Sequence, residues 1–289
     1  MFDSKVSYGF LDEEKESFPL IIAKSGADSL RWFKDNKELI EENILKYGGF
    51  LFRNFGFRSV SEFNNLVNVL ETNLLDYQYR STPRTRLGGK IYTATEYPAD
   101  QAIPLHNENS YTNFWPQKIY FFCVLTAKEG GQTPVADSRK VYNLINPAVR
   151  NKFKKNGIMY VRNFIPGIDL SWQEVFQTAD PNDVATFCEK NKIAYSWLQN
   201  QSAVLQTTQI CQATLKHPKT SENVWFNQAH LFHISALPKE NVEYLLSEVG
   251  KDYLPRNSYY GDGSEIDNED LNHIRATVFF NEMLLHYNT

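Results

Sequence analysis

The sequence predicts a single, mainly β domain that also contains helices, an α+β protein. With 289 residues, 42% of them hydrophobic and 14% aromatic, the chain can bury a sizeable core without disulfide or metal staples. Segments rich in β-branched and aromatic residues alternate with helical patterns, and no Pro-, Gly- or Ser-rich linker divides the chain. We therefore expect one domain over residues 1–289, with a helical and strand-containing N-terminal portion over about 1–78.

Charge and cysteine content exclude several classes of protein. The 30 Lys and Arg against 34 Asp and Glu give a net charge of −4 without any basic block, so nucleic-acid binding is not expected. The three cysteines form no CxxC pair, which argues against a thiolate zinc site or a disulfide framework and fits a reducing compartment. Because the start lacks the order of a secretory signal and the longest apolar run has seven residues, we expect a soluble cytoplasmic protein without a membrane span.

Helical patterns are clear in the first quarter of the chain. The apolar residues of 39–45 would share one helical face, and the Gly pair at 48–49 would end that helix. Residues 59–62 have the Ser-x-x-Glu spacing of a capping box, ahead of apolar residues at helical spacing over 63–70. Between these two helices, the aromatic segment 49–55 is predicted to be a strand.

Later segments continue the alternation. Helices are expected after Asn146-Pro147, after Asp180-Pro181 and over 238–250, because each begins with a typical start signal and two of them end near a glycine. Strands are expected in five segments with β-branched and aromatic residues. These are residues 90–95, 119–125, 158–164, 202–215 and 223–227. A sheet core with helical insertions is the simplest arrangement.

His106 and Glu108 are the first candidates for chemistry. On an extended segment, residues i and i+2 point to the same side, so this imidazole and this carboxylate can converge on one ion. Two histidines and one carboxylate on one face of iron(II) leave positions open for a chelating co-substrate and O₂. The alternative is that both are surface polar residues beside a strand.

Six longer segments surround this pair in sequence. They are residues 48–55, 79–84, 97–111, 130–139, 224–228 and 254–264. In this order they resemble the taurine dioxygenase-like (TauD/TfdA) family of iron(II)- and 2-oxoglutarate-dependent oxygenases, particularly the branch similar to the syringomycin-biosynthesis hydroxylase. The resemblance covers nearly the whole chain. It implies a double-stranded β-helix (jelly roll) core with insertions over about residues 79–289, with helices packed outside it.

The resemblance also implies roles for single residues. His106 and Glu108 would be the first two iron ligands, and His286 near the C-terminus would be the third, the alternative for His286 being a frayed terminal histidine. Thr133, in Gly-Gly-Gln-Thr, would help to hold a carboxylate of 2-oxoglutarate, the alternative being an ordinary turn or strand hydroxyl. Related halogenases have a small residue where Glu108 stands, so the implied reaction is hydroxylation with O₂ and not halogenation.

The C-terminal segment departs from the family pattern. The arginine that pairs with the distal carboxylate of 2-oxoglutarate has no counterpart after His286, and Arg275 is the nearest candidate to replace it. Two other histidines, His230 and His233, are alternatives as ligands, although packing near Trp225 is the expectation for both. The remaining histidines are predicted to be structural; they are His217 and His273.

The implied reaction is hydroxylation of an unactivated C–H bond of a small polar substrate in specialised-metabolite biosynthesis, such as that of an antibiotic. The substrate class would include an amino acid, either free or presented on a carrier protein. We expect Gln101, Asn109 and Asn227 in the substrate pocket, the alternative for each being a hydrogen bond to the local backbone. Two further alternatives stay open: a catalytically degenerate relative that binds a ligand or partner, and a truncated product of an oxygenase gene. The sequence does not predict the oligomeric state.

Overall fold

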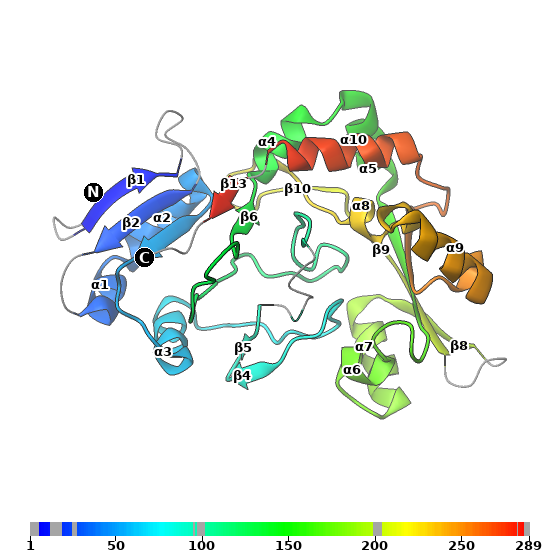
Figure 1. Cartoon of the computed structure of the whole chain (residues 1–289), viewed down its shortest axis with the longest axis horizontal. Helices are drawn as coiled ribbons and strands as arrows, with labels where there is room; N and C mark the ends of the chain where they lie inside the picture. The colour runs from blue at the N-terminus through cyan, green and yellow to red at the C-terminus, as the bar shows by residue number, and fades with distance from the viewer. Residues whose placement is uncertain are drawn as a thin grey trace.

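The computed structural model of the chain describes residues 6–11, 19–24, 28–94, 96, 102–198, 204–281 and 283–285. Within these residues the protein is a mixed α/β structure with five separate sheets, each of two to four strands (Figure 1). The predicted combination of sheets and helices is confirmed. A closed jelly roll, which the family resemblance implies, is not shown by the strand pairings of the described residues. No helix within those ranges is long and apolar enough to cross a bilayer.

A three-stranded sheet and three helices form the N-terminal part of the fold. Strand β2 lies between an antiparallel β1 and a parallel β3, so the helices between β2 and β3 serve as the crossover that a parallel pair requires. Aromatic side chains around the fully buried Phe33 fill the space between sheet and helices. The elements are β1 (Val6–Phe10), β2 (Leu20–Lys24), α1 (Ser29–Asp35), α2 (Lys37–Tyr47), β3 (Phe50–Arg53) and α3 (Val60–Leu70).

Local sequence signals account for α2, β3 and α3. Gly48 ends α2 in the left-handed region with φ of 77°, a conformation that glycine adopts without steric cost. The backbone N–H of Glu62 donates to Ser59 Oγ at 3.2 Å, and the Ser59 N–H donates to Glu62 Oε2 at 3.1 Å, which is the predicted capping box. The two predicted helices and the predicted strand between them are confirmed.

A four-stranded antiparallel sheet forms the centre of the second core. Its strand order is β12-β7-β9-β8, so β7 and β9 are the inner strands. Buried side chains of six helices pack with this sheet into one hydrophobic cluster, and two of the six are the short helices α4 (Ser138–Leu144) and α8 (Ala229–Phe232). The strands are β7 (Ile158–Phe164), β8 (Ala194–Leu198), β9 (Val204–Cys211) and β12 (Arg256–Tyr260), and the other helices are α5 (Pro147–Asn156), α6 (Trp172–Phe176), α7 (Pro181–Asn191) and α10 (Asn268–Phe279).

Short elements connect the two cores. Three two-stranded sheets pair β4 with β5, β6 with β13 and β10 with β11, and short or peripheral helices complete the chain. The strands are β4 (Arg86–Gly88), β5 (Ile91–Tyr92), β6 (Thr133–Val135), β10 (Thr214–Lys216), β11 (Asn223–Trp225) and β13 (Met283–Leu285). The helices are α4 (Ser138–Leu144), α8 (Ala229–Phe232) and α9 (Lys239–Glu248), and the 3-10 turns are η1 (Ile234–Ala236) and η2 (Lys251–Tyr253).

One predicted strand is wrong. Residues 119–125 have no regular secondary structure, and they belong to a long irregular segment between β5 and β6 that runs between the two cores (Figure 1). The side chain of Leu125 is 88% exposed, and Phe121 and Val124 are exposed too. A β-branched and aromatic run forms a strand only where a neighbouring strand pairs with it, and none of the described residues does so here.

The other predicted elements are confirmed with shifted ends. The helices after Asn146 and Asp180 begin with these residues as N-caps, each accepting a backbone N–H at 2.8–2.9 Å. The segment 90–95 shortens to β5, and 202–215 divides into β9 and β10.

Candidate functional site

His106 and Glu108 come together on the irregular segment before β6. The Nε2 atom of His106 lies 3.3 Å from Oε2 of Glu108, although these residues form a coil and turn rather than a strand. Their side chains are 31% and 17% exposed, so the pair is close to solvent but partly enclosed. The convergence that the i, i+2 spacing predicted is observed. Their role as iron ligands stays a prediction.

Contacts around the pair orient both side chains. The Nδ1 atom of His106 lies 2.9 Å from the carbonyl oxygen of Pro104, to which it can only donate, so Nε2 is directed at Glu108. The other carboxylate oxygen, Oε1 of Glu108, accepts from the Tyr77 hydroxyl at 2.8 Å and from Nη2 of Arg84 at 3.3 Å. Each member of the pair therefore has one atom that is held by the protein and one atom that faces the other member.

These contacts also determine the protonation of the pair. Burial by itself would lower the pKa of His106, but the hydrogen bonds to Glu108 and to the Pro104 carbonyl outweigh it and raise that pKa. Burial by itself would raise the pKa of Glu108, yet His106, Arg84 and Tyr77 together lower it. The carboxylate thus stays ionised and favours a positive charge at Nε2, either a proton or a metal ion.

The donor set fits two positions of a metal site. Two ligands at about 2.1 Å from one ion, at a right angle, are about 3 Å apart, close to the 3.3 Å between Nε2 of His106 and Oε2 of Glu108. An imidazole and a carboxylate are two of the three ligands of a facial triad for iron(II). No group of three His, Cys, Asp or Glu side chains forms a metal site among the described residues. The predicted third ligand, His286, lies outside them.

Thr133 is the first residue of β6, and it is half-buried. Its strand pairs with β13 in antiparallel register, so that Leu285 lies opposite Thr133. Strand β13 therefore ends at Leu285, opposite the threonine predicted to bind the co-substrate. His286 is the next residue in the sequence.

The predicted substrate residues differ in their surroundings. Asn227 is fully buried, its Nδ2 donates to the Ala213 carbonyl at 2.8 Å and its Oδ1 accepts from the Ala229 N–H at 3.1 Å, which favours the backbone-binding alternative. Asn109 is buried directly after the candidate pair, in the left-handed region with φ of 56°. Gln101 lies outside the described residues.

All three nitrogens of the Arg275 guanidinium donate hydrogen bonds within the protein. Its Nε and Nη2 atoms donate to the His230 carbonyl at 3.0 and 2.9 Å, Nη2 also donates to Ser235 Oγ at 2.8 Å, and Nη1 donates to Asn272 Oδ1 at 2.9 Å. These bonds fix the end of α8 against α10. The structure therefore gives Arg275 a structural role, and the suggestion that it takes the place of the family's co-substrate arginine is not supported.

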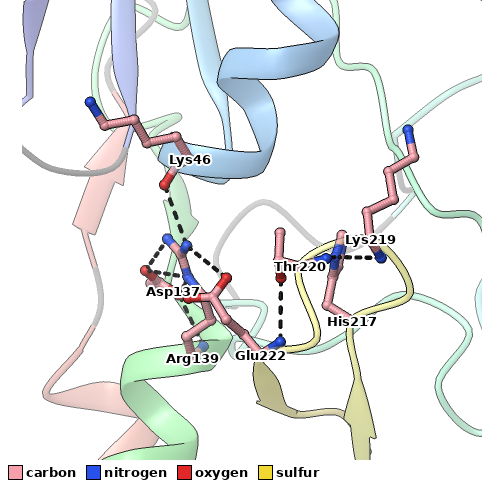
Figure 2. Close-up of polar contacts among 7 residues, drawn as sticks. All are labelled: Lys46, Asp137, Arg139, His217, Lys219, Thr220 and Glu222. Carbon is pink, nitrogen blue, oxygen red and sulfur yellow. Dashed lines mark hydrogen bonds and ion pairs between the residues drawn. The ribbon is translucent and has the colours of Figure 1, made fainter.

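The remaining histidines have individual partners. Burial lowers the pKa of His230 to about 4, and its Nε2 atom lies 3.3 Å from the Leu105 carbonyl. Nδ1 of His233 lies 2.8 Å from the Ser235 hydroxyl. His273 accepts the Asn146 N–H through Nε2 at 2.9 Å, which fits the structural role expected for it. His217 accepts the Thr220 N–H at 3.2 Å in the turn between β10 and β11, and it too has a structural role (Figure 2).

A polar network follows β6 in the chain and is centred on Arg139. Arg139 donates from Nε and Nη2 to the two carboxylate oxygens of Asp137 at 2.9 and 2.8 Å (Figure 2). Its Nη1 atom donates to the Lys46 carbonyl at the end of α2 at 3.3 Å and to Glu222, in the β10–β11 turn, at 3.4 Å. One guanidinium thus joins the N-terminal core, the start of α4 and the β10–β11 hairpin.

Sequence reasoning missed the groups that hold Glu108. Tyr77 and Arg84 lie 31 and 24 residues from it in the chain, and Arg84 also stacks on the Tyr77 ring at 4.4 Å. Arg84 is part of the matched segment 79–84, which was the only signal available for it.

Comparison with known proteins identifies the family. The model of the family described as "Taurine catabolism dioxygenase TauD, TfdA family" matches residues 16–279. The chain belongs to the TauD/TfdA family. Family membership implies iron(II) and 2-oxoglutarate as the metal and co-substrate of an oxygenase.

Two relatives extend this finding. The chain is 42% identical over 250 residues to the dapdiamide synthesis protein DdaC of Enterobacter agglomerans, covering 86% of this chain and 75% of the relative. It is 29% identical over 234 residues to the clavaminate synthase-like protein At3g21360 of Arabidopsis thaliana, covering 74% and 70%. These relatives support the family, and they do not single out the syringomycin branch.

Proposed function

We propose that the protein is an iron(II)- and 2-oxoglutarate-dependent dioxygenase that hydroxylates an unactivated C–H bond of a small polar substrate. The observation that supports this most is the convergence of His106 Nε2 and Glu108 Oε2 in a member of the TauD/TfdA family. These two atoms and His286 would hold the iron, which when bound couples oxidative decarboxylation of 2-oxoglutarate to hydroxylation by O₂.

The residues around the pair would prepare the site before any ligand enters. The Pro104 carbonyl fixes the imidazole tautomer of His106, and Tyr77 and Arg84 hold Oε1 of Glu108 so that Oε2 stays free. Thr133 would donate its hydroxyl to a carboxylate of 2-oxoglutarate. The pairing of β13 with β6 supports this arrangement, because it connects the segment before His286 with the Thr133 strand.

The substrate proposal rests on the relatives. The likeness to a dapdiamide synthesis protein favours a substrate from specialised-metabolite biosynthesis, such as an amino acid that is free or presented on a carrier protein. Asn109 is the described candidate for a pocket residue because it directly follows Glu108 and lies buried beside it.

The test is turnover of 2-oxoglutarate to succinate by the purified protein with iron(II) and O₂. We expect succinate from the wild type and about background from His106→Ala and Glu108→Ala, while His217→Ala, which removes an imidazole from the β10–β11 turn, keeps the wild-type rate. Equal succinate formation by the wild type and His106→Ala would contradict the proposal.

A second candidate is a catalytically degenerate relative that binds a ligand or a partner. It is favoured by one observation: Arg275, the candidate in this sequence for the co-substrate arginine, donates to the His230 carbonyl and to Ser235 instead. Anaerobic calorimetry decides between the two. Binding of 2-oxoglutarate that depends on iron(II) supports the dioxygenase, and its absence supports the degenerate relative.

A further inference from the structure

Arg162 is an unusual residue for the interior of a sheet. It lies on the inner strand β7, opposite Arg256 of β12 and Thr207 of β9, and it is 1% exposed. Charged side chains are almost never fully buried unless they are paired, because removing a charge from water is costly. The groups that contact its guanidinium therefore decide whether this buried charge is compensated.

The guanidinium of Arg162 is only partly satisfied. Nη1 donates to the Arg80 carbonyl at 3.2 Å, and the central carbon of the guanidinium lies 5.1 and 4.8 Å from the ring centres of Tyr79 and Phe164. Nε and Nη2 are buried and have no hydrogen-bond partner among the described residues. Together these two nitrogens form the edge of a guanidinium that binds both oxygens of a carboxylate.

The neighbouring Arg256 binds a carboxylate with the same edge of its guanidinium. Its Nε and Nη2 atoms donate to the two carboxylate oxygens of Asp169, both at 2.7 Å. Asp169 also acts electrostatically with Arg162, but no hydrogen bond from Nε or Nη2 of Arg162 reaches it.

Arginines gather around this edge. Four of them are linked: Arg162 contacts the Arg80 carbonyl, Arg80 contacts the Arg84 carbonyl, and Arg256 lies opposite Arg162 on β12. Glu108 hydrogen-bonds to Arg84, Asp169 hydrogen-bonds to Arg256, and Glu174 acts electrostatically with Arg80. None of these carboxylates hydrogen-bonds to Nε or Nη2 of Arg162, so this edge would favour an incoming anion.

The unpaired edge belongs to the same region as the His106–Glu108 pair. The Tyr111 hydroxyl donates to the Tyr79 carbonyl at 3.2 Å, and Tyr79 carries the ring on which Arg162 stacks. Both Arg162 and Glu108 act electrostatically on this Tyr111 hydroxyl, which is buried near each of them. Tyr111 is therefore a buried polar neighbour that connects the unpaired edge of Arg162 with the segment that carries Glu108.

We infer that Nε and Nη2 of Arg162 form a buried binding site for the carboxylate of a small organic molecule. The inference rests on the proposed function, because that function supplies two such molecules, the dicarboxylate 2-oxoglutarate and a substrate of the amino-acid class. Both present the planar oxygen pair that this guanidinium edge fits.

The test compares the wild type with Arg162→Met and with the matched control Arg150→Met. Arg150 also stacks on a ring, that of Tyr142 at 4.6 Å, donates Nη1 to a carbonyl at 2.7 Å and has an unpaired Nε, but it lies on α5. Succinate, 2-oxoglutarate and L-asparagine are titrated by calorimetry, the last into protein saturated with 2-oxoglutarate. Cobalt(II) affinity and the thermal unfolding midpoint are measured beside them.

We expect Arg162→Met to weaken carboxylate binding about 10- to 100-fold, and Arg150→Met to leave it unchanged. The variant should keep its fold, because an apolar side chain often replaces an uncompensated buried charge without loss of stability. Its cobalt(II) affinity should match that of the wild type. Arg162→Lys keeps the charge but not the two-nitrogen edge, so its affinity should be intermediate.

The individual titrations identify the source of the carboxylate. Weakened binding of 2-oxoglutarate assigns the site to the co-substrate, and weakened binding of asparagine alone assigns it to the substrate. Equal affinities of the wild type and Arg162→Met for all three carboxylates, or no carboxylate binding by the wild type, would overturn the inference. A wild type that binds succinate through Arg162 but turns over no 2-oxoglutarate would sink the dioxygenase proposal and keep the site.

Discussion

Replacing Tyr77 by Phe tests whether the contacts around Glu108 prepare it as a metal ligand. The substitution removes one hydroxyl, which donates to Glu108 Oε1 at 2.8 Å, and it keeps the ring on which Arg84 stacks. A hydrogen bond to a charged group contributes about 1.5–3 kcal/mol, and Glu108 is only 17% exposed, so solvent replaces little of it. At about 1.4 kcal/mol per tenfold change, metal affinity should fall about 10- to 100-fold.

The assay is anaerobic calorimetry with iron(II), or with cobalt(II) in its place. Tyr120→Phe is the matched control, because the Tyr120 hydroxyl donates to Glu71 at 2.7 Å in the N-terminal part of the protein. We expect the control to bind metal like the wild type. Equal metal affinities of Tyr77→Phe and Tyr120→Phe would refute the reasoning, because the contact would then have no influence on Glu108 as a ligand.

Three further predictions concern stability. Burial by itself would raise the pKa of Asp169, but its hydrogen bonds to Arg256 lower that pKa overall. The Asp169–Arg256 ion pair therefore stabilises the fold above the unfolded pKa of about 3.9, and this contribution is lost as pH falls through the lower folded pKa. Urea unfolding from pH 7 to pH 2 should show a larger acid loss in the wild type than in Asp169→Asn, which keeps the other carboxylates of lowered pKa and should be about 3 kcal/mol less stable than the wild type at pH 7. Arg139→Met should lower the free energy of unfolding by about 2 kcal/mol, because it removes the bonds to Asp137 and to the end of α2; an unchanged urea midpoint would argue against that network. Ser59→Ala should cost about 1 kcal/mol by urea unfolding through loss of the α3 capping box, and Ser59→Thr should restore most of it.

Helices whose own residues contain a start signal and an apolar spacing could be predicted from the sequence. The α3 helix follows from its capping box and apolar spacing, and α5 and α7 follow from an N-cap with Pro at the first helical position. The strand predicted at 119–125 failed because a strand also requires a partner, and propensity alone does not supply one.

The candidate site was predictable only in part for the same reason. His106 and Glu108 are two residues apart, so their convergence follows from local geometry. The Tyr77 contact and the burial of Arg162 depend on segments that are far apart in sequence, since β7 lies between β9 and β12. No periodicity in the chain marks such long-range neighbours, and an arginine in a strand pattern ordinarily faces solvent.

The central claim is that His106 and Glu108 bind iron together with 2-oxoglutarate. Anaerobic equilibrium dialysis against iron(II), with and without 2-oxoglutarate, tests it most directly. The wild type should retain about one iron per chain, and more tightly when 2-oxoglutarate is present, whereas His106→Ala and Glu108→Ala should retain almost none. Retention of one iron per chain by either variant, with the same response to 2-oxoglutarate as the wild type, would contradict the account.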